Sequence, residues 1–553
     1  MMPNAGPPTT ARDIGEAALD LIVIGAGING AGIARDAATR GLRVLLLERG
    51  DVGGATTAAS TRLIHGGLRY LEHGEVGLVR ESLRERRTLL RVAPHLVRPL
   101  PFLLPLYRGA RRGPLAIRAG LSAYDLLARG GLPPHRMLSR DEALRREPGL
   151  DPRGLRGAAL YHDAQVTFPE RLALENALSA RDHGAVVLTR ARVDELLVAD
   201  GRVGGVRFTD LATGERRVAR ASVTVNAAGP WVDRVLGPLG SRPLVGGTRG
   251  SHLVVDPFPG APRAALYVEA ESDGRPFFII PWDGRYLIGT TDLRHVGSLE
   301  DPRPDESEIA YLLVETNRVI PSAGLRRADV RLAYAGVRPL PAVPAGDPGG
   351  ITRRHLIVDH AERAADAPAL AGLLSIVGGK LTTYRALAEQ VTDRVFAYLG
   401  RTPPPCVTAR LPLPGANVPD FAAFAVTFAA GSGLPPATAE RLPRIYGVFA
   451  REIARLASAD PALARPLGTV ADSLAAELPY ALGWELARDL EDLIMRRTML
   501  GLDAAAGLDV LDDASDVAGR VLGWDAARRA AARDDYRRAA GRLLPDSLRA
   551  LTG

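Results

Sequence analysis

The strongest constraint on the fold is a glycine-rich turn enclosed by two apolar runs near the start of the chain. Residues 21–24 have the composition of a buried parallel strand, and the glycine-rich turn at 25–30 follows at once. Residues 31–40 are then predicted to be helical and residues 43–47 to form a second strand, which Glu48 ends. This order of strand, turn, helix, strand and acid predicts a dinucleotide-binding fold.

Each part of this pattern has its own role. Gly25 allows the tight turn, Gly27 lets a pyrophosphate approach the backbone, and Gly30 lets the helix pack closely on the strand. Glu48 is expected to accept hydrogen bonds from the adenosine ribose. The pattern alone leaves open whether the dinucleotide is NAD or FAD.

Lysine is almost absent from the chain. Of its 70 basic residues only Lys380 is a lysine. An ammonium is compact and can lose its proton when desolvated, whereas a guanidinium is wide and permanently charged. Lys380 follows two glycines at a predicted helix start, where free backbone N–H groups suit an anion. This favours a functional lysine over a chance survivor on a solvated surface.

Composition and charge exclude several classes of protein. A chain of 553 residues predicts two or three domains, and a single cysteine, Cys406, rules out an internal disulfide or a cysteine metal cluster. The sequence shows no secretory signal and no apolar run that could span a bilayer, so we expect a cytoplasmic protein. The net charge of +7 with only 5% aromatic residues favours an anionic metabolite or an anionic membrane surface over nucleic acid.

A change of composition divides the chain into a first region, 18–400, and a C-terminal region, 405–553, that is rich in Ala, Leu and Arg at helical spacing. A proline-rich stretch at 402–405 links the two. Within the first region, alternating residues between 251 and 292 predict an antiparallel sheet with Asp-Gly turns at 273–274 and 283–284. Further strands are predicted at 186–197, 202–208, 222–225, 333–339 and 356–358, and a helix at 305–320.

Several motifs, in order and spacing, resemble the FAD-dependent aerobic glycerol-3-phosphate dehydrogenases. The most specific are His65-Gly66-Gly67-Leu68-Arg69-Tyr70 and Gly378-Gly379-Lys380-Leu381-Thr382-Thr383-Tyr384-Arg385. The other matching segments are 25–32, 60–64, 250–252, 288–292, 336–340, 351–353 and 476–498. The chain departs from many members at Ala26 and at Thr61-Arg62.

The resemblance implies an α/β fold. It consists of an FAD-binding Rossmann-like domain of the glutathione reductase and D-amino-acid oxidase type, an antiparallel-sheet substrate domain and an all-helical C-terminal domain. The nucleotide-binding parts are expected at about 18–100, 160–245 and 350–400, and the substrate-binding sheet at about 245–350. The residues expected to bind FAD are Gly25, Gly27, Ile28, Asn29, Gly30, Glu48, Arg49, Ser60, Arg62, Leu63, His65, Gly66, Gly67, Val193, Ala228, Gly229, Trp231, Gly379, Lys380, Leu381, Thr382 and Thr383.

The reaction that the resemblance implies is oxidation of sn-glycerol 3-phosphate to dihydroxyacetone phosphate, with a hydride passing to flavin N5. The expected substrate contacts are Arg69, Tyr70, His252, Arg338, Arg353 and Lys380. Planar guanidinium groups match phosphate oxygens with two hydrogen bonds. The catalytic candidates are Lys380, Arg338 and His65; the identity of the base is open, since arginine is a poor base and His65 can equally orient the flavin.

The sequence shows no metal-ligand set. The resemblance implies that the electrons pass to a membrane quinone, with oxygen as the alternative acceptor. An amino-acid or amine oxidase is the alternative class. The segment 98–118 combines apolar residues with Arg98, Arg108, Arg111, Arg112 and Arg118. This pattern predicts peripheral binding to the inner face of the cell membrane. A homodimer is possible.

Overall fold

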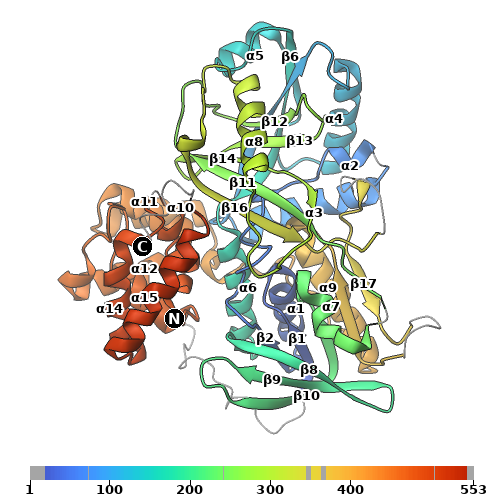
Figure 1. The fold of residues 1–553 in the computed structure, drawn as a ribbon, viewed down its shortest axis with the longest axis vertical. Helices are drawn as coiled ribbons and strands as arrows, with labels where there is room; N and C mark the ends of the chain where they lie inside the picture. Colours follow the sequence, from blue (N-terminus) through green and yellow to red (C-terminus); the bar gives the residue numbers. More distant parts are fainter. Residues whose placement is uncertain are drawn as a thin grey trace.

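The computed structural model describes residues 19–72, 74–240, 242–343, 350–362, 369–503 and 505–544. Two sheets and a set of C-terminal helices make up the molecule (Figure 1). The first sheet has the order β17-β18-β10-β1-β2-β7. Its strands are β1 (Leu19–Ile24), β2 (Val44–Leu47), β7 (Val186–Leu188), β10 (Arg216–Asn226), β17 (Leu356–Asp359) and β18 (Leu373–Val377).

Strands β1, β2, β7, β10 and β18 run parallel, and β17 is antiparallel to β18. The side chains of β2 are all buried, as expected for a parallel strand covered on both faces. One face packs on α1 (Ile28–Thr39), α6 (Pro169–Asp182) and α9 (Tyr384–Tyr398). The other face packs on α7 (Val232–Leu236) and on the hairpin of β8 (Ala191–Ala199) and β9 (Arg202–Asp210), which lies at the bottom of Figure 1.

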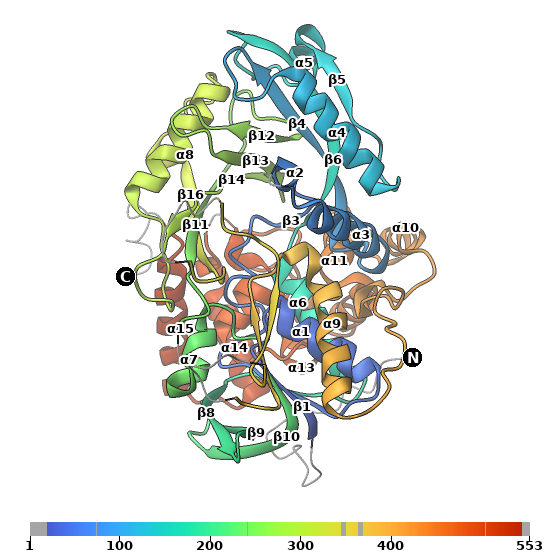
Figure 2. The ribbon, with the colours of Figure 1, turned by 90° about the vertical axis from the view of Figure 1, so that its right-hand side faces the viewer.

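The second sheet is mainly antiparallel and has the order β15-β11-β14-β13-β12-β4-β6-β3, with β16 beside β11 and β5 beside β6. Its strands are β3 (Leu63–Ile64), β4 (Val97–Tyr107), β5 (Arg136–Ser139), β6 (Leu155–Val166), β11 (Thr248–Val255), β12 (Ala265–Glu269), β13 (Pro276–Trp282), β14 (Arg285–Gly289), β15 (Leu293–Arg294) and β16 (Val330–Arg338). Helix α8 (Glu306–Val319) covers one face. Helices α2 (Arg69–Glu72), α3 (Val76–Val92), α4 (Pro114–Ala128) and α5 (Arg140–Arg146) lie near its other strands (Figure 2).

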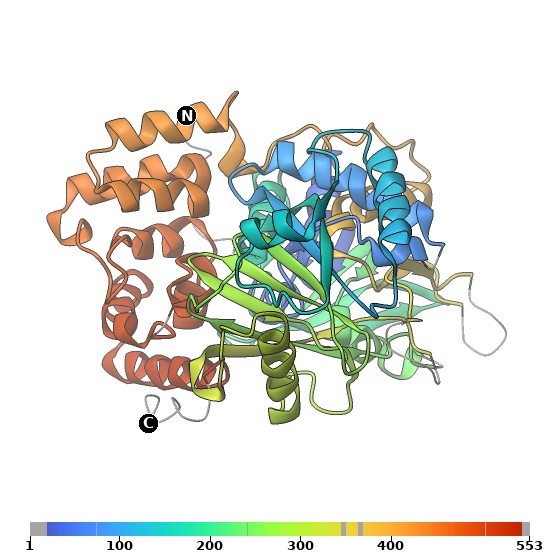
Figure 3. The same cartoon turned by 90° about the horizontal axis from the view of Figure 1, so that it is seen from above.

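The C-terminal helices are α10 (Phe421–Gly431), α11 (Pro436–Tyr446), α12 (Ala450–Ala459), α13 (Glu477–Trp484), α14 (Leu511–Leu522) and α15 (Ala526–Gly541), with a π-helix at Asp492–Arg497. They lie together on one side of the two sheets (Figure 3). Buried ion pairs join them to the first region: Arg497 donates to both oxygens of Asp51 at 2.7 and 2.8 Å, and Arg171 pairs with Glu485 at 2.6 Å.

The predicted fold class is therefore confirmed, and most predicted elements are present at shifted boundaries. The predicted strand at 186–197 is divided, because Arg190 has a φ of 58° and turns the chain between β7 and β8. Both predicted Asp-Gly turns close hairpins of the second sheet.

The prediction that the apolar residues 101–107, within the segment 98–118, contact a membrane is wrong. Residues 97–107 form β4, an interior strand between β12 and β6, and Phe102 and Leu103 are at most 1% exposed. Its apolar side chains are needed in the core and cannot face lipid. Within the part of the chain that the structure describes, no helix is both long and apolar enough to cross a bilayer.

Candidate active site

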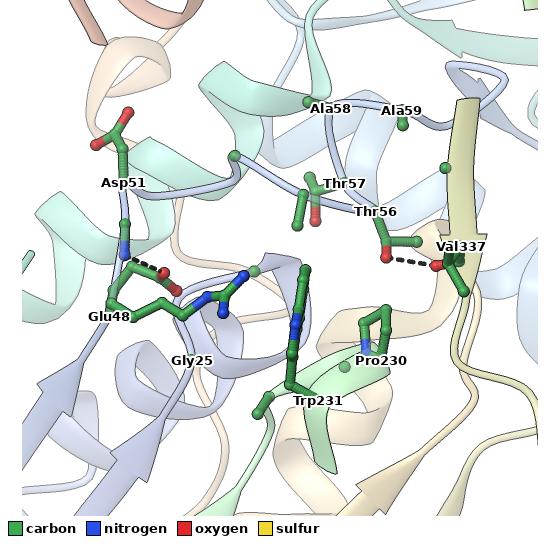
Figure 4. Close-up of a pocket in the computed structure, with 18 of the residues that line it drawn as sticks. Gly25, Glu48, Asp51, Thr56, Thr57, Ala58, Ala59, Pro230, Trp231 and Val337 are labelled. Carbon is green, nitrogen blue, oxygen red and sulfur yellow. Dashed lines mark hydrogen bonds between the residues drawn. The ribbon is translucent and has the colours of Figure 1, made fainter. Parts of the chain in front are cut away.

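A cavity of about 640 Å³ lies where the carboxyl ends of β1 and β2 meet the loop after Glu48, β16 and the segment 378–381 (Figure 4). Ligands bind at the carboxyl ends of strands in open α/β sheets. The helical region contributes part of the wall through Arg496, Met495 and Leu543. The volume lies within the range of small-molecule and cofactor sites.

The three glycines of the turn differ in how much room their surroundings leave for a side chain. Gly25 has a φ of 98°, and a Cβ there would lie 2.8 Å from the carbonyl oxygen of Ala227. A Cβ on Gly30 would lie 1.8 Å from the carbonyl oxygen of Gly25. A Cβ on Gly27 would meet only the Thr57 hydroxyl, at 3.6 Å. Gly25 and Gly30 are thus required by the protein's own packing, whereas Gly27 borders open space in the cavity.

Polar groups around the turn suit a dinucleotide. Glu48 accepts hydrogen bonds from the backbone N–H groups of Ala26 and Gly50 at 2.8 and 2.7 Å, and burial raises the pKa of its carboxyl. Gly27 is the N-cap of α1, so the positive end of the helix dipole faces the cavity. The buried Oδ1 of Asn29 has no hydrogen-bond partner among the described residues. An unsatisfied acceptor, a helix N-terminus and a ribose-facing carboxylate together fit a bound dinucleotide.

One wall of the cavity is aromatic and is formed by Trp231 (Figure 4). Arg49 stacks over the ring of Trp231 at 4.0 Å, and the Trp231 indole donates to Glu300 at 3.2 Å. Sequence reasoning missed Glu300, because it lies in an irregular segment 69 residues from Trp231.

The structure separates the predicted cofactor residues into two groups. Those that line the cavity are Gly25, Gly27, Ile28, Asn29, Glu48, Arg49, Ser60, Arg62, Val193, Ala228, Gly229, Trp231, Gly379, Lys380 and Leu381. Those outside its lining are Gly30, Leu63, His65, Gly66, Gly67, Thr382 and Thr383. Lys380 of the first group nevertheless donates from Nζ to the carbonyl oxygens of His65 and Gly66 at 3.2 and 3.1 Å, so the second group adjoins the first.

Arg62 does not present a free charge to the cavity. Its guanidinium makes two hydrogen bonds to Glu170 at 2.8 and 3.0 Å and stacks over Trp282 at 4.7 Å. No sequence signal singled out Glu170, which lies 108 residues away on α6.

Lys380 lies in a compartment suited to one ammonium group. Its Nζ donates to the carbonyl oxygens of His65 and Gly66 at 3.2 and 3.1 Å and to the Ser82 hydroxyl at 3.0 Å. The same nitrogen lies 4.7 Å from the centre of the Tyr70 ring. Burial is the main cause that lowers the pKa of Lys380 to about 7.

The two candidate histidines are both neutral in the protein. Burial, followed by the charges of Lys380 and Arg86, lowers the pKa of His65 to about 3. His252 is buried, shares a hydrogen bond of 2.9 Å with the Thr61 hydroxyl and stacks on Tyr334. Burial and the charge of Arg338 hold its pKa well below the usual range.

The predicted substrate arginines come together around Tyr70. Burial raises the pKa of the Tyr70 hydroxyl, and the charges of Arg353, Arg338 and Arg69 oppose that rise. The carboxylate of Asp292 pairs with Arg338 at 3.1 Å and with Arg353 at 2.6 Å. Asp292 lies in the segment 288–292, which is one of those that carry the family resemblance, but the sequence analysis does not predict it as a site residue.

A glycine makes room for the Arg338 guanidinium. A Cβ on Gly250, which pairs with Gly336 across β11 and β16, would lie 2.1 Å from Nη2 of Arg338. The guanidinium therefore lies flat against the sheet beside the Thr290 hydroxyl, to which it donates at 2.9 Å.

A parallel dinucleotide-binding sheet joined to an antiparallel sheet that carries a group of cations defines a flavin-dependent oxidoreductase. The family model described as "FAD dependent oxidoreductase" matches residues 20–385, and the model described as "C-terminal domain of alpha-glycerophosphate oxidase" matches residues 406–529. The chain belongs to the family of FAD-dependent glycerol-3-phosphate dehydrogenases, and its cofactor is FAD.

Individual relatives agree with this assignment. A protein named glycerol-3-phosphate dehydrogenase from Synechocystis is 44% identical over 90% of this chain and 92% of its own length. A D-erythritol 1-phosphate dehydrogenase from Brucella abortus is 38% identical over 90% of this chain and 99% of its own. The solved structure of the glycerol-3-phosphate dehydrogenase from Bacillus halodurans complexed with FAD has a TM-score of 0.77 at 27% identity, covering 96% of each chain.

The geometry at Gly27 generates a prediction about cofactor binding. Gly27→Leu should fold, because a Cβ there meets only one hydroxyl at ordinary contact distance, but should lose FAD because the side chain fills the pyrophosphate site. Flavin absorbance after purification and on titration with FAD measures the loss. The matched control is Gly77→Leu on α3, where a Cβ meets no atom within 4 Å. Normal flavin content in Gly27→Leu would show that the pyrophosphate does not cross this turn.

Proposed function

We propose that this protein oxidises sn-glycerol 3-phosphate to dihydroxyacetone phosphate and delivers the electrons to a membrane quinone. The observation that carries the proposal is a group of cations: Arg338 and Arg353 share the Asp292 carboxylate, and Lys380, which lines the cavity, lies 4.7 Å from the Tyr70 ring. The charges of both arginines also act on the Tyr70 hydroxyl. A phosphate ester carries nearly two negative charges at neutral pH and requires several cations. An amino-acid oxidase requires one cation for a carboxylate, so the group of cations favours a phosphate ester.

The residues that would hold FAD are those around the glycine turn, above all Gly27, Asn29 and Glu48, with Lys380 near the reacting end. Bound FAD supplies a two-electron acceptor that takes a hydride at N5 of its ring. Arg338, Arg353, Arg69 and Tyr70 would then hold the phosphate, and the rigid guanidinium positions would orient carbon 2 of the substrate.

We propose His65 as the acceptor of the proton from the substrate's C2 hydroxyl. It is unprotonated in the free protein because burial and neighbouring cations lower its pKa. The charge of a bound phosphate ester offsets those cations and raises the pKa of His65 toward the working pH. Lys380 holds the His65 and Gly66 carbonyl groups, and so also fixes the position of the imidazole.

A dye-reduction assay on the purified holoenzyme tests the substrate, with glycerol 3-phosphate, D-erythritol 1-phosphate and amino acids compared side by side. We expect reduction by glycerol 3-phosphate. Arg353→Ala should lower kcat/KM, mainly through KM, by an amount equivalent to about 2 kcal/mol, since one charge-assisted contact is lost. Arg331→Ala, which removes an arginine of β16 that pairs with Asp256, is the control and should leave kcat/KM unchanged. Reduction by amino acids alone would overturn the assignment.

Lys380→Arg should retain FAD and lose turnover roughly a hundredfold, because a preorganised contact is lost. The compartment around Nζ has three acceptors within 3.2 Å and no room for a wider guanidinium. Flavin content and the single-turnover rate of flavin bleaching by glycerol 3-phosphate measure the two effects.

The same variant has a distinct pH dependence. Lys380 loses its charge as the pH rises through about 7, so anion affinity of the unmodified enzyme should fall above that pH. In Lys380→Arg the charge persists, and the fall should disappear. Inhibition constants for inorganic phosphate between pH 6 and 9 provide the comparison, and equal profiles would count against the assigned role.

We further propose that α4 contacts an anionic membrane surface. Leu115 and Leu126 on this helix are 82% and 78% exposed, and Arg118 and Arg129 are exposed with them. Exposed arginines at 108 and 111 precede the helix. Apolar side chains flanked by cations suit the interface of an anionic bilayer.

Flotation with anionic and with neutral vesicles tests this surface. The unmodified protein should float with anionic vesicles at low salt, and the double variant Leu115→Ser, Leu126→Ser should not, because the apolar side chains that enter the interface are gone. Val314→Ser on α8, which removes a side chain that is 66% exposed, is the control. A double variant that floats as well as the unmodified protein would contradict the proposed surface.

The electron acceptor needs a separate assay with glycerol 3-phosphate as substrate. Reduction of an added quinone analogue indicates a quinone acceptor, whereas formation of hydrogen peroxide indicates oxygen.

A further inference from the structure

Asp292 bridges two arginines that come from different parts of the chain. Its Oδ1 accepts from Nη1 of Arg338, the last residue of β16, and its Oδ2 accepts from Nη2 of Arg353. The three side chains are 14–24% exposed, so the bridge borders solvent at the rim of the sheet and is not part of the core. The carboxylate therefore shares both guanidinium groups with whatever anion binds there.

Each arginine is also tied by other groups. Arg338 donates from Nη2 to the Thr290 hydroxyl at 2.9 Å and to the Thr291 carbonyl oxygen at 3.3 Å. Arg353 donates from Nη1 to the Ile351 carbonyl oxygen at 2.5 Å. These neutral acceptors orient the guanidinium planes, but they do not cancel the positive charge. Asp292 supplies a negative charge between the two arginines.

The electrostatics of the pair show what that charge does. Burial is the main cause that lowers the pKa of Arg338; the charge of Asp292 raises that pKa, and the charge of Arg353 lowers it, as expected for two cations in one site. The two arginines in turn lower the pKa of Asp292, so the carboxylate is ionised at every working pH. Without the Asp292 carboxylate, the two guanidinium groups would repel each other before an anion binds.

We propose that Asp292 is a positioning residue of the substrate site, an internal counterion that holds Arg338 and Arg353 together and competes with the substrate's phosphate group for them. The inference rests on the proposed function, since it takes the bound anion to be a phosphate ester. Its consequence is a moderate affinity: the carboxylate keeps the arginines in place before binding and limits how tightly the phosphate of substrate and product is held.

The test measures anion affinity separately from turnover. Inorganic phosphate is titrated into the holoenzyme and followed by the change in flavin absorbance, and glycerol 3-phosphate kinetics are measured on the same samples. Asp292→Asn and Asp292→Ala should bind phosphate about tenfold more tightly, because a competing negative charge has been removed. Their KM for glycerol 3-phosphate should fall with kcat, since the arginines are less well oriented and product leaves more slowly.

A matched control lies on the same sheet. Asp256 also joins two arginines, Arg331 at 2.7 Å and Arg285 at 3.4 Å, but it lies at the other end of β11. Asp256→Asn should leave phosphate affinity and kcat unchanged. Asp292→Glu, which keeps the charge, should leave phosphate affinity within about twofold while lowering kcat, and it provides the comparison if the neutral variants do not fold.

The outcomes separate the two hypotheses. Unmodified holoenzyme that binds neither phosphate nor glycerol 3-phosphate contradicts the proposed function. If the unmodified enzyme binds both, then unchanged or weaker phosphate binding in the folded, flavin-loaded Asp292→Asn and Asp292→Ala variants overturns the counterion role. A shift in phosphate affinity beyond about fivefold in Asp292→Glu also overturns it.

Discussion

The contact between Gly30 and the Gly25 carbonyl is the constraint on which the site depends. Any side chain at residue 30 would meet that oxygen at 1.8 Å, so only glycine lets α1 lie this close to the end of β1. The close approach brings the N-terminus of α1 to the cavity and sets the Thr57 hydroxyl within 3.1 Å of the Ile28 N–H, from which it accepts. This packing contact therefore places the N-terminus of α1, with the positive end of its dipole, at the cavity.

The helical region is joined to the same loop by buried charge. Asp51, six residues before Thr57, accepts from Arg496 and Arg497, whose charges outweigh burial and lower its pKa. The pKa of the neighbouring Asp492 shifts in the opposite direction: burial and the nearby carboxylates raise it to about 7. Breaking such a buried pair by removing one partner costs about 3–5 kcal/mol. The C-terminal helices thus form part of the wall that holds the cofactor loop in place.

Burial also determines the charge of the two groups proposed to act in the reaction, Lys380 and His65. Burial is the main cause that lowers the pKa of Lys380. Burial also lowers the pKa of His65, and the charges of Lys380 and Arg86 lower it further. Because Lys380 donates to the His65 and Gly66 carbonyl oxygens, one ammonium both orients the loop and controls the charge of the imidazole. On the other side of the site, Asp292 plays a comparable part for the arginines. Before any substrate binds, Lys380 is therefore held by neutral acceptors, whereas Arg338 and Arg353 already share a counterion.

The sequence alone determined the dinucleotide fold, the antiparallel sheet with its Asp-Gly turns and the unusual status of Lys380, because local periodicity and residue type carry that information. It misplaced the role of 98–118, since an apolar run beside arginines is equally typical of an interior strand such as β4. Only the tertiary structure decided that Glu170 neutralises Arg62, that Ser82 holds Lys380 and that Asp292 joins Arg338 to Arg353. These partners are 46 to 298 residues apart, and no local pattern specifies contacts made by folding across such distances.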